Sequence, residues 1–467
     1  MPRHHRPQAA IALALLTVCT PVLAQPSGQP GEPQTDTNAP SDFWHRDTMT
    51  GDWGGLRTEL ADHGIGFSAT YTAEVMANVQ GGIHRGASYM GLLVPKVDVD
   101  LEKLLGWEDA SFRVAMLQGH GPSLSQGWVG DLLGVSGNDT VPPATRLRDL
   151  WLQQNLFGDV VSVRAGIMVV DDEFIVSPTA GLFMNGTFGW PSWAGIDLPA
   201  GGPATPFPAP GVRVRIKQPG DNGLSLQAAI FSGDPTGHNG SNSPDIGLPS
   251  GTVVSFRGGA FLTAELGYAM NHAKDDKGSP ALFKLGAWYH TSNQFQDQRF
   301  ATDGLSLADP LSTGIPRNHS GDWGIYGVVD ASLYQAENGG GLSGFARVAG
   351  SPGDRNAISF YVDGGLAYQG LIPGRDNDTA GFAVAYARIG NNLRGLDQDT
   401  RSFSNPLFPI QNQEVALELT YQVQVTPWMT LQPGIQYVFN PGGNVLNQDG
   451  SIRRNALVLG LQSALTF

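Results

Sequence analysis

The sequence has few cysteines, few charged residues and no long apolar runs. Cys19 is the one cysteine among 467 residues, so the chain after it has no thiol for a disulfide and relies on backbone pairing and burial. The apolar stretch from about 9 to 18 is well short of the roughly 20 apolar residues that a membrane-spanning helix needs, and no other stretch provides one. A disulfide scaffold and a helical membrane protein are therefore disfavoured.

Positive charge is also scarce. The chain has 28 Lys and Arg against 42 Asp and Glu, a net charge of −14, which disfavours nucleic acid as a partner. Only 15% of the residues are charged and 62 are glycine, a composition that favours strands and turns over helices. No break in composition separates two or three domains, so we expect a single large architecture.

The N-terminus reads as an export signal. Arg3 and Arg6 precede the apolar stretch, and Val22-Leu23-Ala24 offers a cleavage site, so residues 1–24 are predicted to be removed. A membrane anchor is disfavoured by length, and a lipid on Cys19 by the branched Val18 before it. Cleavage would remove two arginines and no acid, leaving 26 − 42 = −16. Residues 25–42, rich in Pro, are predicted to be a disordered leader.

Apolar and polar residues alternate with a period of two through most of the chain. From Ile65 to Val75 the odd positions are apolar and most of the even ones polar, and residues 414–425 and 456–467 repeat the pattern, the last run closing on Phe467. Such runs predict 16 strands: 65–80, 90–104, 111–119, 146–157, 160–168, 212–217, 223–232, 259–270, 281–290, 323–334, 342–350, 357–370, 380–390, 413–426, 429–440 and 455–467.

The connections between these strands alternate in length. Those on one side are long, at 120–145, 169–211, 233–258, 291–322, 391–412 and 441–454. Those on the other side are short, at 158–159, 218–222, 335–341 and 427–428, although 81–89 and 351–356 are short where the rule asks for long. Outer-membrane barrels have short periplasmic turns and long external loops, so the sequence predicts an all-β, 16-stranded antiparallel transmembrane barrel over 65–467 in the bacterial outer membrane.

A soluble exported sandwich, propeller or lectin is the alternative fold. It would split into packed halves with more continuous apolar strands, which the sequence does not show. Aromatic residues near the strand ends further favour a membrane girdle: Trp107, Trp151, Phe157, Phe231, Trp288, Tyr289, Tyr334, Tyr368, Tyr386, Trp428, Phe439 and Phe467.

A short amphipathic helix is expected before the first strand, within the segment 43–64. Its prefix, Thr50-Gly51-Asp52-Trp53-Gly54-Gly55-Leu56-Arg57, together with Gly64-Ile65 and Asn78-Val79-Gln80-Gly81-Gly82, resembles the N-terminal region of the carbohydrate-selective porin (OprB) family. The resemblance continues at 211–215, 231–235 and 433–443 and spans nearly all of the chain after the signal.

The resemblance implies a 16-stranded porin of the outer membrane through which glucose and other small neutral sugars diffuse. It also implies that the aromatic Phe467 is recognised by the barrel-assembly machinery, and that outer-membrane lipid surrounds the wall. The sequence leaves open whether the barrel is a monomer or a homo-oligomer. The preferred sugar is equally open, because stereochemical preference depends on side-chain placement within about an ångström.

A 16-stranded barrel encloses water, so selectivity is expected in a loop folded inward. The connection 169–210 is the longest and holds the candidates Asp171, Asp172, Glu173, Phe183, Trp190, Trp193 and Asp197. Trp190 and Trp193 could offer rings to the C–H faces of a sugar, or could simply anchor the loop to the wall.

Basic residues opposite the apolar face are the second group of candidates. Alternation directs Arg113, Arg164, Arg213 and Arg215 into the lumen, since an Arg in hydrocarbon costs ~2–4 kcal/mol at the midplane. Lys96, Asp98, Asp100 and Glu102 form a similar polar face on the second strand. Each of these side chains could bind substrate or could only be solvated by lumen water.

No catalytic group, cofactor or metal is expected. Asp171-Asp172-Glu173 could be a carboxylate or metal cluster, but no ligand pattern surrounds it, and neither an HExxH nor a Gly-x-Ser-x-Gly motif occurs. An outer-membrane barrel hydrolase and a general non-selective porin are the alternative functions.

Overall fold

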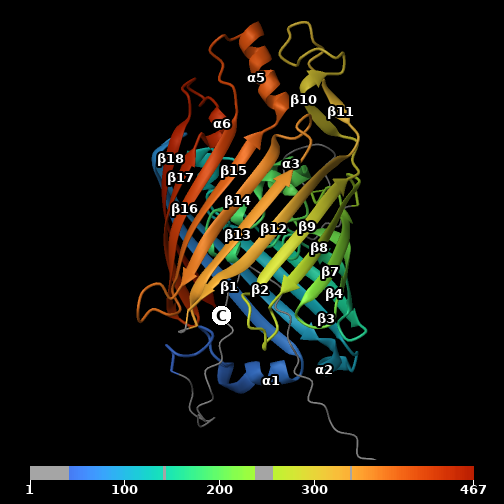
Figure 1. Ribbon diagram of the computed structural model, residues 1–467, viewed down its shortest axis with the longest axis vertical. Helices are drawn as coiled ribbons and strands as arrows, with labels where there is room; N and C mark the ends of the chain where they lie inside the picture. The colour runs from blue at the N-terminus through green and yellow to red at the C-terminus, as the bar shows by residue number, and fades with distance from the viewer. Residues whose placement is uncertain (1–41, 140–142, 237–255, 337–338) are drawn as a thin grey trace, which may run out of the picture.

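The computed structural model describes residues 42–139, 143–236, 256–336 and 339–467, in which sixteen antiparallel strands form a closed barrel. The predicted signal, and all but residue 42 of the predicted leader, lie outside the described residues. The predicted fold class and the sixteen strands are confirmed (Figure 1). The barrel strands are β1 (Ile65–Gly82), β2 (Gly86–Asp100), β3 (Ala110–His120), β4 (Ala144–Leu156), β5 (Val161–Met168), β6 (Ala209–Lys217), β7 (Gly223–Ser232), β8 (Ala260–Met270), β9 (Ala281–His290), β12 (Asp322–Gln335), β13 (Gly341–Gly350), β14 (Ile358–Gln369), β15 (Thr379–Ile389), β16 (Gln413–Thr426), β17 (Met429–Phe439) and β18 (Arg454–Thr466).

Alternation along each strand produces a lipid-type outer face and an inner face packed by loops. On β1, Glu74 is fully buried while the neighbouring Val75 is 52% exposed, and on β6 Arg213 is buried between the exposed Val212 and Val214. β1 pairs with β18 and thereby closes the cylinder. Because a one-residue slip would turn Arg113, Arg164 and Arg213 outward, the apolar outer face fixes the register.

The second strand ends earlier than predicted. β2 stops at Asp100, and Leu101–Leu105 form the helix α2. The Asp100 carboxylate accepts hydrogen bonds from the backbone N–H groups of Glu102 (3.1 Å) and Lys103 (3.2 Å), which is N-terminal capping. The prediction that Glu102 lies on the inner face of a strand is therefore wrong.

Two long connections contain regular structure that the sequence reading assigned to loops. The connection after β9 carries the hairpin β10 (Phe295–Ala301) and β11 (Pro316–His319), and the one after β15 carries α5 (Asn391–Phe403). Both stand above the barrel at the long-loop end, while α1 (Leu56–Asp62) and α2 lie at the opposite end (Figure 1). The predicted helix before the first strand is present as α1.

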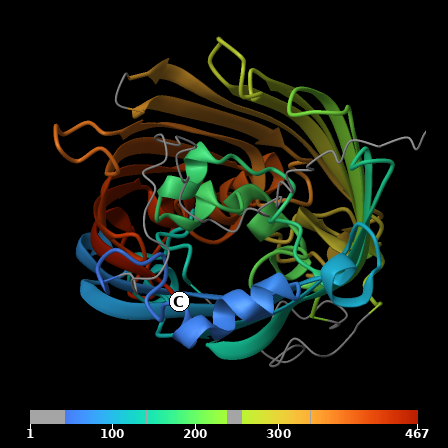
Figure 2. The same cartoon turned by 90° about the horizontal axis from the view of Figure 1, so that it is seen from below.

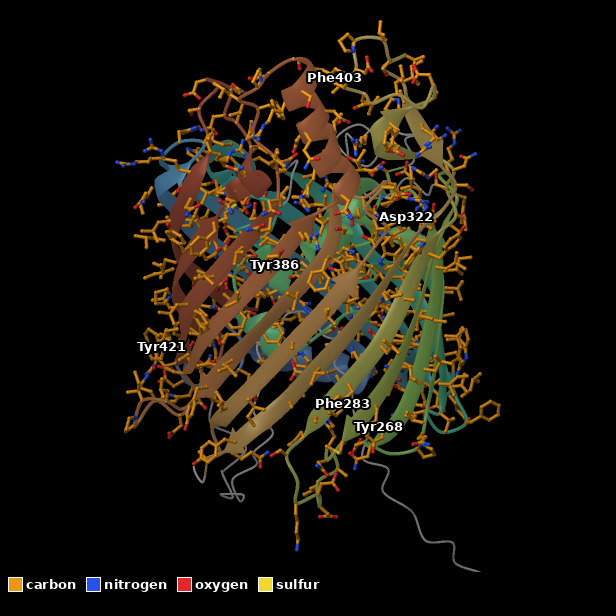
Figure 3. The ribbon with its side chains drawn as sticks, turned by 45° about the horizontal axis from the view of Figure 1, so that its top comes forward. Tyr268, Phe283, Asp322, Tyr386, Phe403 and Tyr421 are labelled. Atoms are coloured by element: carbon orange, nitrogen blue, oxygen red, sulfur yellow. The ribbon has the colours of Figure 1, made fainter. Side chains whose placement is uncertain are left out.

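The prediction of an aromatic girdle holds only in part. Tyr289 and Tyr334 are about half exposed, and Tyr268 and Phe283 lie near the short-turn end of the wall, as Figure 3 shows. Trp151, Phe231 and Trp288 instead face inward and are buried, because the interior loops need an apolar surface to pack on. No helix within the described residues is long and apolar enough to cross a membrane.

Candidate functional site

The connection between β5 and β6 folds into the barrel. It contains the short helix α3 (Ser192–Asp197) and the helical turns η3 (Thr179–Leu182), η4 (Gly186–Phe188) and η5 (Pro199–Gly201). The remaining short elements lie elsewhere: η1 (Trp53–Gly55) precedes α1, η2 (Ser125–Val129) follows β3, and α6 (Pro441–Asn444) follows β17. Seen along the axis, the connection between β5 and β6 lies inside the ring of strands (Figure 2). We call residues 169–208 the inner loop.

The predicted acidic and basic candidates meet at the start of the inner loop. Arg213 donates to both carboxylate oxygens of Glu173, at 2.6 and 2.7 Å, and Arg164 lies 3.4 Å from the same carboxylate. Asp172 forms a bidentate pair with Arg148, at 2.5 and 3.0 Å. These charges therefore fasten the inner loop to the wall of β4 to β6.

Arg148 is a site residue that the alternation pattern of the sequence did not predict. β3 and β4 shift register between the pairs Ala115–Asp149 and Met116–Leu147, so one residue of β4 has no opposite partner. Such a bulge breaks the period of two and lets adjacent residues face the same side. Both Arg148 and Asp149 are consequently buried on the inside.

We call the ion pairs of Asp172 and Glu173 with Arg148, Arg164 and Arg213 the clamp. Its charges give the nearby carboxyls of Glu173 and Asp171 different pKa values. Burial raises the pKa of the Glu173 carboxyl, but the guanidinium groups of Arg164 and Arg213 outweigh burial and hold this pKa below its usual value. Burial, followed by the charge of Asp172, raises the pKa of Asp171 to about 6. Asp171 accepts a hydrogen bond from the Thr205 backbone N–H at 3.0 Å, so it ties the two ends of the inner loop together.

The aromatic candidates anchor the loop. Trp193 has no exposed surface, packs against Trp288 with ring centroids 5.7 Å apart, and donates its indole N–H to the Ser351 hydroxyl at 3.0 Å. Trp190 is half-buried and donates to the Gly201 carbonyl at 3.0 Å. The structure therefore favours anchoring for Trp193, while Trp190 stays partly exposed.

Phe183 and Asp197 also face the wall. Phe183 packs against Phe188 and Phe345, with centroids 5.0 and 6.0 Å apart. The Asp197 carboxylate accepts from the Ser351 hydroxyl at 2.9 Å and from the Ile358 backbone N–H at 3.1 Å. Both residues therefore hold the loop in place.

Wall carboxylates and one arginine hold the backbone of the inner loop. Glu418 accepts from the Met184 and Asn185 N–H groups at 2.8 and 2.9 Å, and Asp330 accepts from the Thr179 N–H at 2.9 Å. Glu265 accepts from the Ile175 N–H at 3.0 Å. Arg347 donates to the carbonyls of Ile175, Thr187 and Gly189. Buried polar groups paired in this way fix the loop path.

A second loop, 121–139, also folds inward, which the sequence reading did not predict. Glu414 of β16 accepts from the Leu132 and Leu133 N–H groups, at 2.9 and 2.8 Å. The two loops bond to each other from Gly137 N–H to the Met184 carbonyl (2.8 Å) and from Gly186 N–H to the Gly134 carbonyl (2.7 Å). Together they narrow the lumen.

The wall of β2 to β6 is rich in cations. Arg113 pairs with Asp98 at 2.5 Å, and the guanidinium groups of Arg113 and Arg164 lie 5.1 and 4.0 Å from the ring centroid of Trp151. Lys96 and Arg215 lie on the same inner face, next to Arg113 and Arg213 respectively, and neither side chain makes a hydrogen bond or ion pair with another described residue.

Comparisons with known proteins agree with this geometry. The family model "Carbohydrate-selective porin, OprB family" matches residues 84–467. Porin B of Pseudomonas aeruginosa is 28% identical over 450 residues, covering 92% of each chain, and the putative porin QuiX of Acinetobacter baylyi is 24% identical over 457 residues, covering 91% of this chain and 95% of that one. A high-pH structure of Pseudomonas putida OprB superimposes with a TM-score of 0.78 at 27% identity and covers 91% of this chain and 100% of that chain. The chain belongs to the OprB family of carbohydrate-selective porins and is a sugar channel of the bacterial outer membrane.

Proposed function

We propose that the channel passes neutral monosaccharides, glucose among them, by passive diffusion, and that its constriction lies between the two inward loops and the wall of β2 to β6. The main support for this proposal is that the inner loop is anchored along its length. It is held from the ion pair of Glu173 with Arg213 to the hydrogen bond that Asp197 accepts from Ser351. A constriction held this firmly has a fixed width, which is what discrimination by solute size requires.

We assign direct contact with the sugar to part of the candidate set only. Arg215 is only partly buried on the inner face of β6 and forms no ion pair with another described residue, and Trp190 of the inner loop is also only partly buried. Guanidinium groups donate to several sugar hydroxyls at once. Asp171, Asp172, Glu173, Arg164, Arg213 and Trp193 are assigned to positioning of the loop, because their polar groups or faces are occupied by each other or by the wall. Arg113 is buried, pairs with Asp98 and lies over Trp151, so we assign it to the wall as well.

Liposome swelling with a panel of neutral sugars tests the proposal. We expect glucose to enter faster than a disaccharide, and Arg215→Gln to slow glucose entry several-fold, with a smaller change in potassium chloride conductance. Arg85→Gln is the matched control, since Arg85 is exposed between β1 and β2. Equal entry rates for monosaccharides, disaccharides and amino acids would instead establish a general porin.

We propose that the protein catalyses no reaction. Incubation of the purified barrel with lipid and ester substrates tests this point, because turnover abolished by a single Ser or His substitution would establish a hydrolase.

We further propose that the barrel-assembly machinery recognises Phe467 and that outer-membrane lipid covers the wall. Cross-linking in membranes would decide between a monomer and a homo-oligomer.

A further inference from the structure

We propose that residues 43–57, at the short-turn end of the barrel (Figure 1), form a clasp that holds shut the seam between the first strand, β1, and the last strand, β18. The clasp includes Gly51–Arg57, part of the segment that resembles the N-terminal region of the OprB family, which we call the signature. This role is separate from sugar passage. The proposal gives a physical reason for a motif that the channel mechanism leaves unused.

The seam is incomplete at its periplasmic end. The ladder between β1 and β18 starts at the pair Thr70–Thr466, and β18 ends at Thr466, whereas β1 begins at Ile65. Beyond the bond from the Phe467 N–H to the Ala69 carbonyl (2.8 Å), the first residues of β1 have no strand partner on that side within the described part of the chain. A strand edge of this kind leaves backbone N–H and C=O groups unpaired and is a point at which a sheet can open.

Arg57 bridges the two strands at this point. Its Nη2 donates to the carbonyl of Phe67 on β1 (2.7 Å) and to the backbone oxygen of Phe467 (2.8 Å). Its Nη1 donates to the Thr48 hydroxyl (2.8 Å) and the Gly51 carbonyl (3.2 Å). Only a planar guanidinium offers donors in several fixed directions, so Lys could not replace all of these bonds.

Two further contacts extend the clasp along the rim. The Met49 N–H donates to the Thr466 carbonyl at 2.8 Å, which adds a backbone bond to the end of β18. Trp428, in the turn between β16 and β17, donates its indole N–H to the Phe43 carbonyl at 3.0 Å and packs on the Phe43 ring at 4.9 Å. The clasp therefore reaches from β1 across β18 to the neighbouring hairpin.

The signature residues shape the turn that delivers Arg57. Gly54 and Gly55 have φ of 72° and 99°, values that favour glycine, and Trp53 itself has φ of 53°. The Asp52 carboxylate accepts from the Thr58 backbone N–H (2.9 Å) and hydroxyl (2.8 Å), which fixes the start of α1. The Trp53 ring lies 5.1 Å from the Arg57 guanidinium and 6.1 Å from the Phe67 ring.

Hydrogen exchange of the purified full-length porin in lipid tests the clasp. In Arg57→Gln we expect the amides of Thr70–Val75 and of Leu461–Thr466 to exchange roughly tenfold faster, because charge-assisted hydrogen bonds at the seam are lost. The β15–β16 amides and the rate of glucose entry should stay unchanged. Arg85→Gln, at the opposite end of β1, is the matched control and should exchange like the unaltered protein.

A covalent seam distinguishes the clasp from general stabilisation. Tyr71 and Leu465 are register partners, and Cys19 is the chain's single cysteine, so Tyr71→Cys with Leu465→Cys can be oxidised to lock the seam. The lock should abolish the effect of Arg57→Gln, and should restore a folded barrel if that variant alone does not assemble. Unchanged seam exchange, equal acceleration in all strands, or failure of the lock to rescue would each overturn the proposal.

Discussion

At the scale of single residues, Trp193 holds the inner loop by packing and by a hydrogen bond. Its ring fills a site between the loop and Trp288, and its N–H reaches Ser351. We expect Trp193→Ala to cost about 3–5 kcal/mol of local packing, as buried Trp truncations do. The loop should then loosen, so sugar flux and small-ion conductance should change together and current noise should rise in planar bilayers. Lower sugar flux at unchanged ion conductance would instead show that the ring touches the sugar.

Residue direction could be read from the sequence, but residue pairing could not. Alternation correctly placed Arg113, Arg164 and Arg213 inside the barrel, because an outward register would expose them to hydrocarbon. The ion pairs of Glu173 with Arg164 and Arg213 depend on the path of the inner loop, and no local period in the sequence encodes that path. Arg148 was missed because a bulge reverses the parity on β4.

At the scale of elements, the inner loop depends on the ion pairs at its start. Glu173→Gln would leave Arg164 and Arg213 buried without a counter-charge, which typically costs about 3–5 kcal/mol. We expect this variant to lose discrimination between glucose and disaccharides in liposome swelling. Ser225→Ala on β7 is a control outside the clamp. Retained discrimination would show that the other anchors suffice.

The pH response of the inner loop follows from its two unlike carboxyls. The folded pKa of Glu173 is lowered, so its stabilisation is complete above its unfolded value near 4.3 and is lost only below that pH. The pKa of Asp171 is raised to about 6, so ionisation of this carboxyl opposes folding from about pH 4 upward and fully above 6. We expect acidification from pH 7.5 to 5 to leave the clamp intact and to reduce cation preference in reversal-potential measurements. Asp171→Asn should reduce that shift but not remove it, because burial also raises the pKa of Asp139, on the second inward loop, to about 6.

Elements with a local period were predictable, and elements set by distant partners were not. Each barrel strand has its own alternation and was expected within a few residues. The hairpin β10–β11 instead depends on Asp297, which accepts from Arg317 at 2.6 Å and from Asn392, 95 residues away, at 2.9 Å. The helix α2 stands where the end of a strand was predicted, because the Asp100 side chain caps the N-terminus of that helix. In the sequence, Asp100 also fits the polar positions of the strand pattern, so its capping role was not recognised.

At the scale of the whole molecule, net charge is a poor guide to the lumen. The chain carries −14, a charge that taken alone favours cations and neutral solutes over anions. Many inner carboxylates are nevertheless used as acceptors for loop backbone, as Glu418 is for Met184, 234 residues away in sequence. Because such long-range pairs decide which charges face the solute, the sequence predicted the barrel but not its electrostatics.

Lys96 and Arg215 should therefore dominate ion selectivity, since they are inner-face cations that make no ion pair with another described residue. We expect Lys96→Gln and Arg215→Gln each to shift the reversal potential in a salt gradient toward cations. Lys103→Gln, an equal charge change on the exposed helix α2 at the periplasmic rim, should shift it much less. An equal shift in all three variants would mean that selectivity follows total charge, and that the two inner cations have no special position in the pathway.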